Sequence, residues 1–118
     1  MDITDLMIGD PVEDPDFGYV TVVGIGFCEG VPTVEVMIDQ STRTEVPASQ
    51  IKPISLTKGM FKKNGIMIGA GESIKGYNLM ASKNGYFWIE DHCLIKFKYL
   101  HEFLHILKSC GISMTFRI

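Results

Sequence analysis

Residues 19–39 read YVTVVGIGFCEGVPTVEVMID, and this stretch decides how the first half of the chain folds. Its first seven residues are rich in β-branched side chains, which favour strands, and Gly24 and Gly26 permit a bend or bulge. Its last seven residues alternate between two faces, as a half-buried strand does. The sequence EGVP between these strands has the composition of a turn. We therefore expect two strands, the second with its apolar face formed by Val34, Val36 and Ile38.

Similar short segments continue on both sides of this stretch. Residues 6–12 and 43–46 are strand-like, and the acidic residues 13–16 have the composition of a solvated loop. The sequence PASQ at 47–50 fits a single 3₁₀ turn before a further extended stretch at 51–54. Short strands separated by turn signals are typical of a small sandwich or barrel. We expect no helix in this half.

The second half begins with a short helix. Thr57 is suited to cap a helix over residues 58–63, and the glycine of Asn64-Gly65 is suited to end it. A short strand is predicted at 66–68, and the glycine-rich residues 69–73 are predicted to form a loop.

A hairpin and a terminal helix follow. Asn84-Gly85 is a strong hairpin signal, and it lies between strand-like residues 77–81 and 86–90. Another extended stretch at 93–97 leads into an amphipathic helix at about 99–110, which Gly111 ends. The remaining predicted strand lies near the C-terminus, at residues 113–117.

The charges are divided unevenly along the chain. Residues 1–50 hold ten acidic side chains against Arg43 alone, a formal charge of −9, whereas residues 51–118 hold ten basic and four acidic side chains, a charge of +6. Neutralisation of phosphates dominates nucleic-acid affinity, so the acidic half is a poor candidate for holding DNA or RNA. The favoured interpretation is two halves that pack together, and the alternative is a binding role for either face.

Composition and the N-terminal residues indicate the compartment. The 118 residues suffice for one domain with its own core. No apolar run approaches the roughly 20 residues of a membrane span, and the start MDITD lacks the basic residues of a signal or transit peptide. An odd number of cysteines without a Cys-x-x-Cys pair argues against a disulfide framework. We expect a cytoplasmic protein without membrane contact, with three buried, reduced thiols: Cys28, Cys93 and Cys110.

The sharpest chemical pattern is HEFLH at residues 101–105, the His-Glu-x-x-His form of zinc metallopeptidases. In those helices the two histidines bind zinc on one face and the glutamate activates a water. Here His101 and His105 would be the ligands and Glu102 the base of a zinc-dependent hydrolase. A helical projection at about 100° per residue puts both histidines and Lys108 on one polar face.

The surroundings of this pattern count against a zinc site. No His, Glu or Asp follows His105, so a third ligand would have to come from the upstream cluster at residues 90–93. Lys108 would also place a cation on the same face, which disfavours a bound dication. We therefore predict no catalytic residue, no metal and no cofactor, and we interpret the two histidines as part of a solvated polar face.

Aromatic and basic residues interleave in the second half, as they do on nucleic-acid surfaces that stack bases and neutralise phosphates. Strand alternation sends residues 86 and 88 to one face and residues 87 and 89 to the other, so one of these sets must belong to the core. Core packing is the favoured interpretation. The alternative is a partner or nucleic-acid surface made of Tyr86, Trp88, Lys96 and Lys98.

Four segments carry a resemblance to a family. They are LMIGDPV at 6–12, GYVTV at 18–22, IKPISLT at 51–57 and IKFKYLHEF at 95–103. Together they resemble small uncharacterised proteins encoded by gut anaerobic bacteria and their prophages. The resemblance implies an SH3-like barrel, a mobile-element setting and no established activity. In the terminal helix, the first histidine matches a pattern that recurs in this family, and the second does not belong to it.

The sequence and the resemblance together predict an α+β protein with an SH3-like β-barrel over residues 1–54. An α+β half over residues 55–118 would pack against the barrel as one structural unit. We expect an interaction or accessory protein, not an enzyme, whose partner is another protein. Two alternatives stay open: a zinc-dependent hydrolase on the 101–105 helix, and nucleic-acid binding through residues 55–118.

Overall fold

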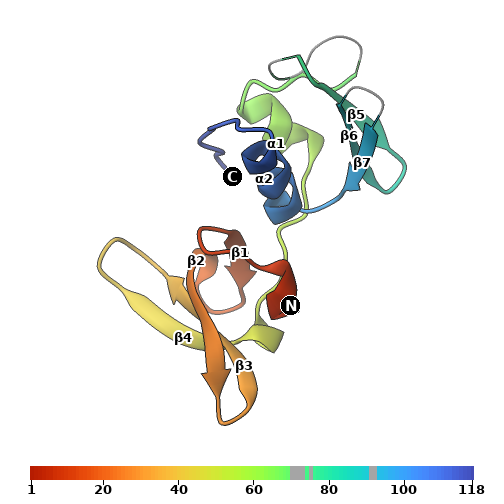
Figure 1. The fold of residues 1–118 in the computed structure, drawn as a ribbon. Coiled ribbons are helices and arrows are strands. Elements are labelled where there is room, and N and C mark those ends of the chain that lie inside the picture. Colours follow the sequence, from red (N-terminus) through yellow and green to blue (C-terminus); the bar gives the residue numbers. More distant parts are fainter. Residues whose placement is uncertain (70–73, 75, 91–92) are drawn as a thin grey trace. The chain divides into compact units, whose positions relative to one another are not determined.

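The computed structural model describes residues 1–69, 74, 76–90 and 93–118. The chain forms two compact units, Met1–Ile54 and Ser55–Ile118, each with an antiparallel sheet of its own (Figure 1). The described part of the first unit has strands and short 3₁₀ turns, and both α-helices lie in the second. The predicted α+β class is therefore confirmed.

The sheet of the N-terminal unit has four strands in sequential order. They are β1 (Pro11–Asp14), β2 (Gly18–Cys28), β3 (Val31–Met37) and β4 (Arg43–Pro47), with 3₁₀ turns η1 (Ile3–Asp5) and η2 (Ala48–Gln50) at the two ends. The 3₁₀ turn expected at 47–50 is thus present as η2. β1 begins later than the strand expected at 6–12, because the Asp10 carboxylate accepts a hydrogen bond from the Met7 N–H at 2.8 Å and holds a turn there.

The predicted hairpin of β2 and β3 is present and has two special features. The register of the pairing shifts between Val22 and Gly24, which is the bulge that the glycines permit. Glu29 and Gly30 form the two-residue turn with φ of 52° and 79°. Positive φ at both residues is the requirement of a type I′ turn, whose twist matches that of the strands.

Inward-facing side chains of all four strands build the core of the N-terminal unit. The predicted apolar face of β3 lies there, with Val34 and Val36 fully buried, and Ile38 packs at its margin. The buried cluster consists of Leu6, Val12, Val20, Val22, Val34, Val36, Val46, Ala48 and Ile51.

The ladders of the N-terminal unit do not close into a barrel within the described residues, since β1 and β4 remain the two edges of the sheet. A single bridge links β1 to the segment after η2, where Glu13 and Lys52 exchange two backbone hydrogen bonds of 2.9 Å. The extended stretch expected at 51–54 is reduced to this bridge, because Pro53 has no N–H to continue a ladder. The predicted SH3-like barrel is therefore not confirmed.

The described residues of the C-terminal unit form a three-stranded sheet and two helices (Figure 1). Its elements are α1 (Lys58–Lys63), β5 (Asn78–Ser82), β6 (Gly85–Glu90), β7 (Cys93–Phe97) and α2 (Leu100–Ser109). The predicted cap of α1 is confirmed, since the Thr57 hydroxyl accepts a hydrogen bond from the Met60 N–H at 3.2 Å. In the part of the chain that the structure describes, no helix is long and apolar enough to cross a membrane.

The strands predicted at 66–68 and 113–117 are wrong. The first stretch closes α1 instead, because the Ile66 N–H donates to the Phe61 carbonyl at 2.9 Å and the Ile66 side chain is buried. The second is held by a side chain: the Asn64 amide exchanges two 2.7 Å hydrogen bonds with the Arg117 backbone. The loop predicted at 69–73 lies outside the described residues except for its first glycine.

Aromatic rings fill the core of the C-terminal unit. Phe61 of α1 makes edge-to-face contacts with Tyr86 at 4.8 Å and with Phe103 at 5.3 Å between ring centroids. Trp88 is fully buried and stacks on Tyr77 at 4.9 Å. The inner face of β6 and the apolar face of α2 therefore share one core.

The β5–β6 hairpin is present, but its turn differs from the expected one. Ser82 pairs with Gly85, so the turn consists of Lys83 and Asn84, and Gly85 is the first residue of β6. A Cβ atom at Gly85 would lie 2.5 Å from the Phe97 carbonyl oxygen, at a φ of 153°. The glycine is therefore required by the close approach of the neighbouring strand.

We predict that Gly85→Ala lowers the free energy of unfolding of the C-terminal unit by about 2 kcal/mol, because β7 must shift to make room. Gly59→Ala is the control, since a Cβ atom there meets only the Thr57 hydroxyl at 3.8 Å. That helical substitution should stabilise the unit by roughly 0.5–1 kcal/mol. Urea unfolding followed by the fluorescence of Trp88, the one tryptophan, measures both. If the two variants are equally stable, the pairing register of β6 with β7, which brings Gly85 close to Phe97, is wrong.

Candidate functional site

Helix α2 carries both histidines of the HEFLH sequence. The His101 ring is only 5% exposed and stacks on Tyr99 at 5.9 Å, and the His105 ring lies edge-on to it at 5.7 Å. Within the described residues, no three His, Cys, Asp or Glu side chains come together as a metal site. Asp91 and His92, two of the upstream candidates, lie outside the described residues.

Glu102, the glutamate of the HEFLH sequence, caps the helix. Its carboxylate accepts hydrogen bonds from the N–H groups of Lys98 at 3.0 Å and Tyr99 at 2.9 Å. This capping arrangement satisfies N–H groups that a helix start leaves without partners, and it engages one carboxylate oxygen of the residue considered as a general base. The interpretation of a solvated polar face is wrong for His101, because packing against Tyr99 buries its ring.

The aromatic residues considered for base stacking lie in the core. Tyr86 is 7% and Trp88 0% exposed, because helices α1 and α2 supply the aromatic partners of this face of the sheet. On the other face, Phe87 is the cross-strand neighbour of Lys96, which is exposed. Tyr86 and Trp88 are therefore too buried to form the proposed base-stacking surface.

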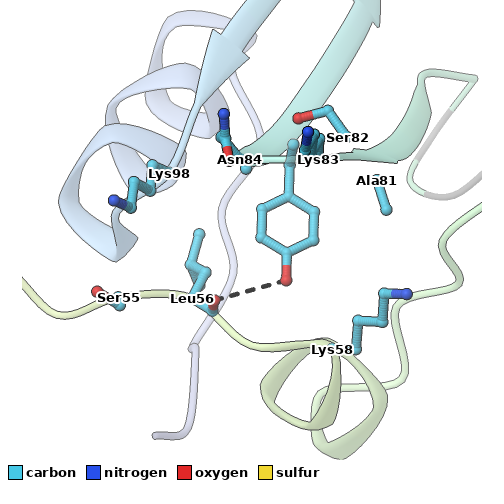
Figure 2. A pocket seen from close by; sticks show the side chains of 10 residues that line it. Ser55, Leu56, Lys58, Ala81, Ser82, Lys83, Asn84 and Lys98 are labelled. Carbon is cyan, nitrogen blue, oxygen red and sulfur yellow. Dashed lines mark hydrogen bonds between the residues drawn. The ribbon is translucent and has the colours of Figure 1, made fainter.

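A pocket of about 410 Å³ opens at the turn of the β5–β6 hairpin (Figure 2). Its walls come from the segment before α1, from the hairpin turn and from the residue after β7. The dashed line in Figure 2 marks the hydrogen bond that the Leu56 carbonyl accepts from a lining side chain, that of Tyr86. The pocket is large enough for a side-chain-sized ligand.

Backbone pairing positions the wall that precedes α1. The Leu56 N–H donates to the Lys98 carbonyl at 3.2 Å, and Ser55 forms an antiparallel bridge with Tyr99. The Tyr86 hydroxyl donates to the Leu56 carbonyl at 3.5 Å. Burial raises the pKa of Tyr86, so this hydroxyl stays protonated at neutral pH. The wall is therefore fixed to the sheet before the chain turns into α1.

Three lysines from separate parts of the chain line the pocket: Lys58, Lys83 and Lys98. None of the described lining residues is acidic. Ser82 also lines the pocket, and its buried hydroxyl has no hydrogen-bond partner among the described residues. Lysines that line a small pocket attract anions through their ammonium groups. The arrangement is suited to hold a carboxylate or phosphate group.

No protein-family model, curated protein or solved structure was found to match this chain. Function must therefore be inferred from the chemistry of the pocket itself.

The pocket brings together only part of the predicted set. Tyr86 and Lys98 line it, whereas Trp88 lies in the core and Lys96 lies on the outer face of β7. Lys58 and Lys83 were not among the binding residues predicted from the sequence. The sequence gives only their local positions: Lys58 lies at a helix start, and Lys83 lies in a hairpin turn.

The cysteines also differ from expectation. Cys28 and Cys93 are exposed, and Cys110 is half-buried, with its sulfur 3.7 Å from a Glu90 carboxylate oxygen. Burial, followed by the negative charge of Glu90, raises the pKa of the Cys110 thiol. A protonated thiol is a poor nucleophile, so nothing at this position indicates cysteine-based catalysis.

Proposed function

We propose that the protein is a non-enzymatic interaction protein whose C-terminal unit binds an anionic group of a partner protein in the three-lysine pocket. The observation that carries this proposal is that Lys58, Lys83 and Lys98 come from three separate segments and line one pocket whose described lining contains no acidic residue. Because the three lysines belong to different elements, a ligand among them would be contacted from several sides.

A protein partner suits this pocket better than a nucleic acid. A polyanion needs a basic track along which many phosphates are neutralised, whereas these three lysines line one small pocket. The rings that would have stacked on bases, Tyr86 and Trp88, are buried. The N-terminal unit, with ten acidic and two basic residues, carries a formal charge of −8 and would repel a long polyanion.

Hydrolase activity has less support. Glu102 holds the start of α2 and His101 packs on Tyr99, so both carry out structural tasks in the helix. A catalytic zinc site needs three protein ligands and an open position for water. Binding without catalysis is the function that these contacts favour.

We further propose that the N-terminal unit is of the SH3-like type. Support comes from the order of its elements: four sequential antiparallel strands, a 3₁₀ turn, and a segment that returns to the first strand at the Glu13–Lys52 bridge. Extension of that bridge into a ladder would pair the free edge of β1 with a fifth strand that follows η2.

The binding proposal is tested with hexaglutamate as the probe, by fluorescence anisotropy of the labelled peptide. The double variant Lys58→Glu with Lys83→Glu should bind about tenfold more weakly, a change of about 1.4 kcal/mol. The control is Lys62→Glu with Lys108→Glu, which makes the same charge change on exposed residues that do not line the pocket. Unfolding curves establish that all variants remain folded.

If both double variants weaken hexaglutamate binding equally, the proposed binding in the pocket is wrong. The peptide would then be held only by the overall positive charge of the C-terminal unit. The same measurement with a single-stranded oligo-dT tests whether the partner is a nucleic acid. If it binds more tightly than hexaglutamate and loses affinity in the pocket variant, the partner is a nucleic acid and the proposal of a protein partner fails.

A further inference from the structure

β7 is an edge strand with exposed apolar side chains. The sheet order β5-β6-β7 leaves one side of β7 without a neighbouring strand among the described residues. Leu94 is 60% and Ile95 38% exposed, although they point to opposite faces of the sheet. An edge strand that is apolar on both faces is suited to pair with another strand.

The backbone groups on the free side of β7 can be identified. The Phe97 carbonyl faces Gly85 of β6, whereas the Lys98 carbonyl accepts the Leu56 N–H and so faces the opposite side. Backbone direction alternates along a strand, so residues 94 and 96 share the direction of Lys98. Their N–H and C=O groups therefore point away from β6 and towards the open edge.

The chain already uses the end of this edge for strand pairing. Ser55 and Leu56 pair with Tyr99 and Lys98 as the beginning of a fourth strand. The chain then leaves the edge at Thr57, which caps α1, and the described residues provide no strand to continue along β7. The edge is thus ready for strand addition from residue 97 back to residue 94.

We propose that the β7 edge binds an extended acidic segment of a partner protein as an added strand. This inference rests on the proposed function, since the added strand and the pocket would engage one partner. Lys96 lies on the outer face of β7, and Lys98 both continues β7 and lines the pocket. A strand on this edge would therefore meet two ammonium groups, the second at the pocket itself.

Charge decides between an acidic partner and a second copy of the chain. The C-terminal unit has nine basic and four acidic residues, a formal charge of +5. Pairing of β7 with β7 of a second copy would bring two such units together, with Lys96 and Lys98 of both copies at one seam. An acidic segment instead places opposite charges across the pair, which stabilises antiparallel and parallel pairing alike.

The test uses a capped peptide of alternating Glu and Val, EVEVEV, with binding measured by fluorescence anisotropy. Leu94→Pro removes the outward N–H without removing a hydrogen bond to β6, because that N–H points to the open edge. It should weaken peptide binding by about tenfold, whereas Leu94→Val should leave binding within about twofold. Trp88 fluorescence during urea unfolding establishes that both variants are folded.

A second measurement leaves the protein unchanged. The same peptide with N-methyl groups on the residues that face β7 cannot donate to the edge and should bind about tenfold more weakly. The peptide KVKVKV should not bind. Equal affinity of the methylated and unmethylated peptides, together with no effect of Leu94→Pro, would overturn the edge proposal.

The experiments distinguish failure of the pocket proposal from failure of the edge proposal. If hexaglutamate binding depends on Lys58 and Lys83 but EVEVEV binding ignores Leu94→Pro and N-methylation, the proposed function stands and the added strand is wrong. If Leu94→Pro abolishes a dimer seen by analytical ultracentrifugation while EVEVEV never binds, the occupant of the edge is a second copy, and an acidic partner is excluded.

Discussion

Replacement of Asp14 by alanine is expected to lower the free energy of unfolding of the N-terminal unit by about 3 kcal/mol. Asp14 is fully buried at the end of β1. One carboxylate oxygen accepts hydrogen bonds from the N–H groups of Asp16 at 2.8 Å and Phe17 at 3.1 Å, and the other accepts from the Gln50 side chain at 3.0 Å. Alanine removes all three bonds and the support of the β1–β2 turn.

The matched control for this prediction is Asp16→Ala. Asp16 is exposed, and its carboxylate makes one 3.4 Å contact with Gln50, so the change should stay within about 0.5 kcal/mol. Hydrogen exchange of the slowest amides in β2 and β3 reports the stability of this unit separately from the other. If Asp14→Ala and Asp16→Ala give the same exchange rates, the buried carboxylate does not hold the turn.

Replacement of Phe61 by alanine should destabilise the C-terminal unit by about 3–5 kcal/mol, the range for deletion of a buried aromatic ring. Phe61 is fully buried and contacts the rings of Tyr86, Phe103 and Phe116. Its loss removes the contact between α1 and the sheet, so the pocket wall at Leu56 should also loosen.

Phe116→Ala provides the comparison, because that ring is only half-buried and lies at the margin of the same cluster at 6.3 Å from Phe61. We expect a loss of about 1 kcal/mol there, in line with partial burial of the ring. Urea unfolding followed by Trp88 fluorescence measures both variants. A smaller effect for Phe61→Ala than for Phe116→Ala would contradict the assignment of Phe61 to the centre of the core.

Local features were predicted well because the residues that decide them are neighbours in sequence. Thr57 caps α1 through a group three residues away, and Glu29-Gly30 forms its turn through its own backbone angles. The strand expected at 113–117 failed because its backbone is held by Asn64, about fifty residues earlier in the chain. No local pattern contains such a contact.

The buried face of β6 illustrates the limit of strand alternation. Alternation separates Tyr86 and Trp88 from Phe87 and Ile89, but both sets are apolar and either would suit a core. The choice is made by the rings of Phe61 and Phe103, which come from two helices and pack on one face. Burial of the first set then removes the stacking surface that the sequence suggested.

The candidate site was beyond the reach of sequence patterns for a similar reason. Its lysines come from a helix start, a hairpin turn and the residue after β7, and no fixed spacing relates the three. Charge counting pointed only to a basic half. On the acidic side, Asp10 and Asp14 are buried and accept hydrogen bonds that shape turns, so part of that half's charge is structural.

The most direct test of the account is the position at which an acidic peptide binds. In amide NMR spectra of the complete chain titrated with hexaglutamate, we expect the largest shifts around Ser55 to Lys58, around Ser82 to Tyr86, and at Lys98. The amides around Lys62 and Lys108, on basic surface outside the pocket, should shift little. Shifts spread evenly over all exposed lysines, or centred on Lys62 and Lys108, would contradict binding in the pocket.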